Sequence, residues 1–365
     1  MICGYSRYEG RVEQMQTINH VEPNIHPLMD DIDRLFALLS DAPQRMLVKP
    51  VFDRSFKSLV DVFNKFNPWE YTWEVAYTDT PYPPLNAMQN KNIILCFSGG
   101  KDSIAAAIKY KELGYNVQLY HLKHINPSFA DEWECAQRSA DLLGMPIFFD
   151  DIGFKGHHMW MEHPMKNMII ANGALSYGIR EGITTNIAFG NYLTSELVDN
   201  AFDRCAGDCM DMWNSYDVIV QRAIPDFKVM AVLDNMGDTL NLLADRANLL
   251  NESLSCLCRH SLRDYRRNWV KEKFGVDLFH NRCGSCYKCC VEYIYMADHD
   301  KLPFNEDYYK YCLGQLYRVT VSERFLIMSM FALWSEFIFY PPQKSKIYEK
   351  MLKARLMTRS IKWVK

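Results

Sequence analysis

The sequence predicts an α/β protein whose parallel sheet is doubly wound, with helices on both of its faces. From about Asn92 to Leu254, short apolar runs alternate with longer runs of helix-favouring residues. This alternation is typical of parallel sheets, because each connection between parallel strands crosses over through a helix. Two further observations are a turn rich in glycine and serine directly after an apolar run, and a cluster of cysteines farther along the chain.

We expect the strands and helices of this region to follow in regular alternation. They are a strand at 93–97, a helix at 102–113, a strand at 116–121, a helix at 130–143, a strand at 146–151, a helix near 163–180 and a strand at 186–190. Ligands of such sheets bind at the carboxyl ends of the strands. The turn after the first of these strands is therefore the expected position of a binding site.

The chain divides into three predicted regions. Residues 1–88 form an N-terminal accessory unit, and the prolines at 81, 83 and 84 mark its end. Residues 89–255 form the sheet domain, and residues 256–365 form a helical C-terminal region that contains the clustered cysteines.

The accessory unit contains two predicted helices, one beginning at Pro27 and one over 54–66. Residues 71–77 have strand character. We assign no chemistry to this unit.

Composition is that of an ordinary soluble globular protein. Apolar residues make up 48% and charged residues 23% of the 365 positions, and the net charge of −3 excludes bulk attraction to nucleic acid. No membrane-spanning helix is expected, because the best candidate, residues 321–340, contains charged residues typical of an amphipathic core helix. Residues 1–11 lack the apolar core of a secretory signal, so we expect a cytoplasmic protein. In that reducing compartment the 12 cysteines indicate metal ligation rather than disulfides.

The most informative segment is the turn at 98–103, with the sequence Ser-Gly-Gly-Lys-Asp-Ser. A junction of strand, turn and helix binds anions, because the first N–H groups of the helix lack intrahelical partners and the helix dipole is positive there. The glycines let the backbone approach a phosphate, the serines add hydroxyl donors, and the lysine adds a mobile cation. The spacing differs from that of a Walker A loop.

The cysteine cluster is the second strong signal. Two residues separate Cys283 from Cys286 and Cys286 from Cys289, and Cys256 and Cys258 lie upstream. This spacing lets a tight turn direct successive thiolates at one ion, and a fourth ligand from the upstream pair would close a tetrahedral zinc site. A closed site is structural rather than catalytic. An iron–sulfur cluster is the rival interpretation, and cysteines used as small core side chains are the plainer alternative.

The turn resembles the signature of the PP-loop ATP pyrophosphatases, which implies a Rossmann-like PP-loop fold and an ATP-binding domain over 89–255. In that family the loop holds the β- and γ-phosphates of ATP, and a substrate oxygen attacks the α-phosphate to give AMP and pyrophosphate. The implied cofactors are ATP and Mg²⁺. The implied nucleotide-binding residues are Phe97, Ser98, Gly99, Gly100, Lys101, Asp102, Ser103, Tyr120 and Gly190.

The resemblance also implies Lys101, Asp102 and Ser103 as catalytic residues. Lys101, the N–H groups of the turn and Mg²⁺ would neutralise the charge that develops on pyrophosphate. Asp102 would orient Mg²⁺ or, as the plainer alternative, cap the helix. Backbone atoms near Tyr120 and His121 would contact the adenine edge. The His121 side chain would act in acid–base steps or, by default, be exposed to solvent.

Together, the turn and the cysteines resemble the 7-cyano-7-deazaguanine synthase group of this family, over about residues 92–295. Ser255-Cys256 is similar to the group's Ser-Cys ligand, which favours Cys256 over Cys258 as the first ligand. The implied zinc ligands are therefore Cys256, Cys283, Cys286 and Cys289. Phe189-Gly190-Asn191 looks like the group's Gly-x-Asn turn.

Members of this group adenylate the carboxylate of 7-carboxy-7-deazaguanine. Ammonia then displaces AMP to give an amide, and a second round of ATP use converts the amide to a nitrile. The implied partners are thus ATP, a small carboxylated deazapurine-like base and ammonia. The product would feed the modification of tRNA or DNA, or a related conjugation.

The chain departs from this group in ways that leave the substrate open. A charged segment at 260–282, expected to be helical, separates the first and second cysteine ligands, and the helix start near 235–238 lacks the group's lysine. One alternative is a PP-loop enzyme that directly thiolates or otherwise modifies a nucleic acid, with an iron–sulfur cluster. The other is a non-catalytic nucleotide-binding regulatory or assembly subunit.

The C-terminal tail, residues 344–365, has eight Lys or Arg and a single acidic residue, Glu349. It is a candidate contact for tRNA, DNA or the acidic surface of a protein partner. A solvated amphipathic helix is the plainer interpretation.

Overall fold

The computed structural model describes residues 26–40, 50–66, 74–88, 90–123, 132–150, 166–190, 210–233, 236–254, 256 and 260–321. Several predictions fall wholly or largely on residues outside these ranges, among them the helix over 321–340, the basic tail at 344–365 and the alternative ligand Cys258.

A five-stranded sheet, in which all neighbouring strands are parallel, forms the centre of the fold. Its strands are β3 (Asn92–Cys96), β4 (Asn116–Leu122), β5 (Ile147–Asp150), β6 (Ile187–Phe189) and β7 (Met230–Ala231). Their spatial order is β5-β4-β3-β6-β7. The prediction of an α/β protein with a parallel sheet is confirmed. The apolar run of β3 is buried on both sides, as a strand between two layers of helices must be.

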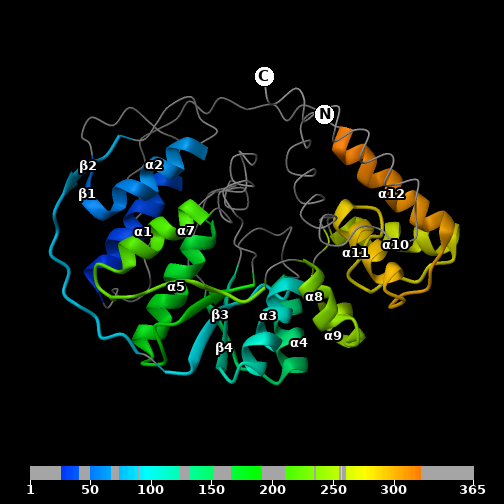
Figure 1. Cartoon of the computed structure of the whole chain (residues 1–365), viewed down its shortest axis with the longest axis horizontal. Coiled ribbons are helices and arrows are strands. Elements are labelled where there is room, and N and C mark those ends of the chain that lie inside the picture. Colours follow the sequence, from blue (N-terminus) through cyan, green and yellow to red (C-terminus); the bar gives the residue numbers. More distant parts are fainter. Residues whose placement is uncertain are drawn as a thin grey trace.

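Helices cover both faces of this sheet (Figure 1). On one face lie α1 (Pro27–Ser40), α2 (Lys57–Phe66), α5 (Lys166–Arg180) and α7 (Met210–Val220). On the other lie α3 (Lys101–Glu112), α4 (Glu132–Leu143), α8 (Met236–Leu243) and α9 (Ala247–Glu252). Successive side chains of β3 alternate between the two layers: Ile94 packs with the first and Ile93 with the second.

The N-terminal helices share a hydrophobic core with the first face of the sheet. α1 packs on α5, where the buried Asn172 donates to the Asp33 carboxylate at 2.6 Å. α2 packs on α7. The domain boundary at residue 88 stays a prediction.

A two-stranded parallel sheet of β1 (Val51–Asp53) and β2 (Ala76–Thr78) joins this region, and the 3₁₀ turn η1 (Arg54–Phe56) precedes α2. The strand predicted over 71–77 thus differs from the structure: among the described residues, which begin at 74, the strand spans Ala76–Thr78. The cause is its pairing: β2 aligns with a strand only three residues long, Val51 opposite Ala76.

Three C-terminal helices, α10 (His260–Phe274), α11 (Tyr287–Asp298) and α12 (Glu306–Val321), extend the second layer beyond α8 and α9 (Figure 1). The expected helix in the charged segment at 260–282 is thus present as α10. Among the described residues, no helix combines the length and apolar character needed to cross a bilayer.

Candidate functional site

The glycine turn lies at the carboxyl edge of the sheet, between β3 and α3. The chain moves outward from β3 through β4 to β5, then returns to place β6 on the other side of β3. Connections therefore leave β3 and β6 in opposite directions. Open parallel sheets bind ligands in the crevice that such a reversal creates.

Two glycines let neighbouring backbone approach the turn closely. Gly99 has a φ of +71°, and a Cβ there would lie 2.7 Å from the backbone nitrogen of Ala136 in α4. Gly190, directly after β6, would place a Cβ 2.7 Å from the carbonyl group of Asp102. The turn is therefore held between the start of α4 and the end of β6, and any side chain at either glycine would displace it.

The two serines close the turn on itself. Ser103 Oγ donates to the Gly100 carbonyl at 2.9 Å, and the Gly100 N–H donates to Ser98 Oγ at 3.3 Å. Ser98 is exposed, whereas Ser103 is buried. Ser98 is thus the hydroxyl at the turn that solvent or a ligand can reach.

The acidic and basic residues of the turn bind each other. Lys101 is buried, and its Nζ donates to the Asp102 carboxylate at 2.7 Å. The expectation of a mobile lysine cation is therefore wrong. The N-cap of α3 is Gly100, without a side-chain cap, so Asp102 lies in the first turn of the helix and the interpretation of Asp102 as its cap is also wrong. A carboxylate in that turn still interacts favourably with the positive end of the helix dipole.

The ends of β3 and β4 are joined through Phe97. Its N–H donates to the Tyr120 carbonyl at 2.7 Å, and its own carbonyl accepts a hydrogen bond from His121 Nδ1 at 2.8 Å. His121 is only 3% exposed, so its default interpretation as a solvated loop histidine is wrong. An adenine contact from residues 120 and 121 stays a prediction.

The Tyr120 side chain packs in the hydrophobic core of the layer that contains α1, α2, α5 and α7. Its hydroxyl donates to the Asp150 carboxylate at 2.6 Å, at the end of β5. Burial, and then the charge of Asp150, raise the pKa of Tyr120 well above its usual range. It therefore stays a neutral donor at any physiological pH.

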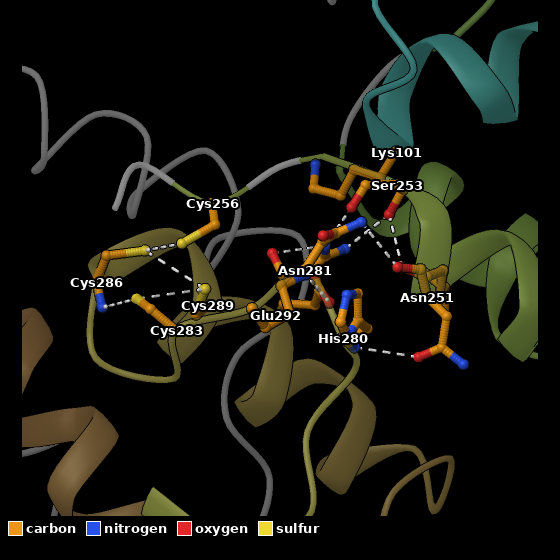
Figure 2. A network of polar contacts seen from close by, with 12 residues as sticks. Lys101, Asn251, Ser253, Cys256, His280, Asn281, Cys283, Cys286, Cys289 and Glu292 are labelled. Atoms are coloured by element: carbon orange, nitrogen blue, oxygen red, sulfur yellow. Dashed lines mark hydrogen bonds and ion pairs between the residues drawn. The ribbon is translucent and has the colours of Figure 1, made fainter. Parts of the chain in front are cut away.

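The four predicted zinc ligands, Cys256, Cys283, Cys286 and Cys289, come together in space, and Figure 2 shows their sulfur atoms directed toward one another. All four Sγ atoms lie within 4.8 Å of one another. The Sγ atoms of Cys256 and Cys286 are 3.9 Å apart, and those of Cys283 and Cys289 are 4.0 Å apart. A zinc tetrahedron with Zn–S bonds of about 2.3 Å has edges of about 3.8 Å. The cluster therefore fits one tetrahedral ion, whereas several irons between the thiolates would spread them farther apart.

Backbone donors and neighbouring thiols favour a thiolate at Cys283. Its Sγ accepts the N–H groups of Ser285 at 3.4 Å and Cys286 at 3.3 Å. Hydrogen bonds from Cys256, Cys286 and Cys289, and then from the Ser285 backbone, hold the pKa of Cys283 well below its usual range. Metal ions bind the thiolate form of cysteine, and the two backbone N–H groups stabilise that form at Cys283.

The turn between the second and third ligands depends on Gly284. Its φ is +68°, and an added Cβ would lie 2.8 Å from the hydroxyl of Tyr308, which itself donates to the Gly284 carbonyl at 2.8 Å. A glycine is therefore required at this position of the tight turn.

Sequence reasoning missed the polar groups around the cysteines. Arg282, directly before the second ligand, is 2% exposed and pairs with Glu292 at 2.8 Å. Its guanidinium also donates to the carbonyl of Ser253 at 2.6 Å. An arginine next to a cysteine looks like a surface residue in sequence, because its buried partners, Ser253 and Glu292, lie at a distance along the chain.

Comparison with known proteins identifies no family. No family model matches the chain, and no curated protein matches it. Among solved structures, one match is the predicted subunit of a tRNA methyltransferase from Methanocaldococcus jannaschii, with 17% identity over 46% of this chain and 93% of that one, at a TM-score of 0.26. A likeness at this level does not bear on what the chain binds or catalyses.

Proposed function

We propose that this protein is an ATP-dependent, AMP-forming enzyme of the PP-loop type that adenylates a carboxylate, similar to 7-cyano-7-deazaguanine synthases. One observation supports this above all. The Ser-Gly-Gly-Lys-Asp-Ser turn lies at the carboxyl end of β3, where the strand order reverses, and it leads into the positive end of α3. The strand order is also that of Rossmann-like sheets.

The proposed reaction begins with the attack of a substrate carboxylate oxygen on the α-phosphorus of ATP. The bond from this phosphorus to the bridging oxygen breaks, and pyrophosphate leaves. Ammonia then attacks the acyl carbon, AMP leaves with the bonding electrons, and the amide nitrogen loses a proton. Adenylation is required because a free carboxylate has no good leaving group at neutral pH.

The chain's own groups have defined tasks in this scheme. The N–H groups at the start of α3 and the exposed Ser98 hydroxyl hold phosphate oxygens. Lys101 stabilises the developing charge on pyrophosphate from within the protein. The Asp102 carboxylate, with a side chain 36% exposed, is the residue that would hold Mg²⁺, which supplies additional charge neutralisation when bound.

The metal at the four cysteines has a structural task in this proposal. Four thiolates would fill all four positions of a tetrahedral ion, which would leave no open position for a substrate. Zinc would fasten the stretch that contains Cys256 to the start of α11.

The non-catalytic alternative has one observation in its favour. Lys101 already has a partner in Asp102 at 2.7 Å, an arrangement that suits nucleotide binding without turnover. The alternative of direct nucleic-acid thiolation with an iron–sulfur cluster is not favoured by the sulfur spacing.

Pyrophosphate release tests the proposal. The protein is incubated with Mg-ATP, ammonium and 7-carboxy-7-deazaguanine, beside the variant Lys101→Ala and the matched control Lys111→Ala on the exposed far end of the same helix. We expect release that depends on the base, is unchanged in the control, and falls at least about 100-fold in Lys101→Ala, the scale of losing one group that stabilises transition-state charge. ATP binding without release for any carboxylated base would favour the non-catalytic alternative.

A further inference from the structure

The glycine turn and the four-cysteine cluster are physically connected by the end of α9 and the short stretch of chain that follows it. Leu254 donates its N–H to the carbonyl of Gly99 at 3.0 Å, and Cys256 follows two residues later. The same stretch therefore contacts the turn at one point and supplies a metal ligand at another. We call the described residues 251–254 and 256, which begin in the last turn of α9, the bridging stretch.

The contact with Gly99 determines how the turn presents a donor. In a trans peptide, the C=O of one residue and the N–H of the next point in opposite directions. Holding the Gly99 carbonyl against Leu254 therefore fixes the direction of the Gly100 N–H, which faces the exposed Ser98 hydroxyl at 3.3 Å. If the bridging stretch moved, this donor would turn with it.

Arg282 holds the bridging stretch from the side of the cysteines. Its guanidinium donates to the Ser253 carbonyl at 2.6 Å and to Ser253 Oγ at 2.9 Å, while Nε is paired with Glu292 at 2.8 Å. All three residues are buried. Because the guanidinium presents its donors in a rigid fork, it fixes the positions of the groups that accept these hydrogen bonds, in addition to pairing with the charge of Glu292.

The preceding residues continue this contact. Asn281 Nδ2 donates to the carbonyls of Asn251 and Glu252, both at 3.0 Å, and the His280 N–H donates to Asn251 Oδ1 at 3.2 Å. These carbonyls lie at the end of α9, where intrahelical partners are lacking. Three consecutive carbonyls, at 251, 252 and 253, are thus bound by the residues that lead into Cys283.

We propose that metal binding at the four cysteines is coupled to anion binding at the glycine turn, and that Arg282 and Ser253 are the positioning residues of this coupling. A metal ion joins Cys256 to Cys283, Cys286 and Cys289, and so draws together the two segments that Arg282 joins. It thereby fixes Leu254 against Gly99 and orders the turn. The inference rests on the proposed function only in taking the anion to be the triphosphate of ATP.

Such coupling is reciprocal: if zinc tightens nucleotide binding, the nucleotide must tighten zinc binding by the same factor. A merely structural zinc, needed only for folding, would not respond to nucleotide in a protein that is already folded. This difference provides a test that does not depend on catalysis.

The test measures zinc affinity of the zinc-loaded full chain by competition with a coloured chelator, with and without a Mg²⁺-bound ATP analogue that has a methylene group between its α- and β-phosphorus. We expect the analogue to raise zinc affinity about tenfold, within the usual range of coupling between sites. Arg282→Lys should abolish this increase, because an ammonium keeps the charge beside Glu292 but cannot reach both acceptors of Ser253. Lys271→Met is the matched control, since Lys271 lies on the adjoining α10 and pairs with Asp277 at 3.0 Å, outside the network.

Hydrogen exchange provides a second readout and separates the two proposals. Arg282→Lys, with zinc bound, should speed exchange of the Leu254 amide and of amides at 97–103, and Lys271→Met should not. Analogue binding without any change in zinc affinity would overturn the coupling. If the analogue does not bind, the proposed function fails, and hydrogen exchange alone then tests the coupling. Exchange in Arg282→Lys equal to that of the parent would in that case overturn the coupling as well. Ser253→Ala, which removes only the Oγ contacts, replaces Arg282→Lys should that variant not fold.

Discussion

Gly99→Ala is predicted to destabilise the protein for two separable reasons. The φ of +71° costs an L-residue roughly 1–2 kcal/mol. In addition, the new Cβ would lie 2.7 Å from the nitrogen and 2.8 Å from the Cα of Ala136, backbone atoms that cannot rotate away. Forcing extra volume into a packed position costs about 1–3 kcal/mol more, so the expected loss in unfolding free energy is about 2–5 kcal/mol.

Gly144→Ala is the matched control for the backbone contribution. Gly144 has a φ of +62°, and a Cβ there would meet nothing within 4 Å, so only the conformational cost of roughly 1–2 kcal/mol applies. Urea unfolding of both variants gives the comparison, provided that the m-value is unchanged. Equal losses for the two variants would show that α4 does not press on the turn, and the packing described for the candidate site would be wrong.

Two further predictions concern pH and metal content. Burial raises the pKa of Asp217 to about 6, although the Val229 N–H lowers it. Since this pKa lies above the ordinary value of 3.8, the native state binds the proton more tightly, and this group makes the unfolding free energy fall as pH rises from about 4 to about 6. The unfolding free energy of Asp217→Asn, measured in urea, should therefore rise relative to that of the parent by up to about 3 kcal/mol over that pH range. A difference between the two proteins that does not change with pH would contradict the raised pKa. For the metal, Cys286→Ser should abolish the bound zinc seen by elemental analysis, whereas Cys290→Ser, beside the cluster but outside it, should retain it.

Most of the sheet could be predicted from the sequence, because alternation of apolar strands and helices is a local property. The strand expected at 93–97 is β3 at Asn92–Cys96, and the helix expected at 102–113 is α3 at Lys101–Glu112. The strand at 71–77 was placed less well. Its position depends on pairing with a short strand near residue 51, which no local pattern shows.

The four cysteine ligands could also be predicted, in part from spacing and in part from a family resemblance. Spacing alone predicts Cys283, Cys286 and Cys289, since two intervening residues suit one ion. The resemblance favoured Cys256, and the structure places its Sγ within 4.8 Å of the other three.

The sequence by itself determined the elements whose signals are local: the glycine turn between strand and helix, the alternation that produces a parallel sheet, and the spacing of the cysteines. Only the tertiary structure decided which groups face each other across the chain. In the fold, Lys101 is buried and donates to Asp102, His121 is buried and bonds to the carbonyl of Phe97, and Arg282 donates to the carbonyl of Ser253. The physical reason is that burial and pairing depend on contacts between distant segments. A charged or polar residue has the same letter in the sequence whether it is solvated or held between two helices.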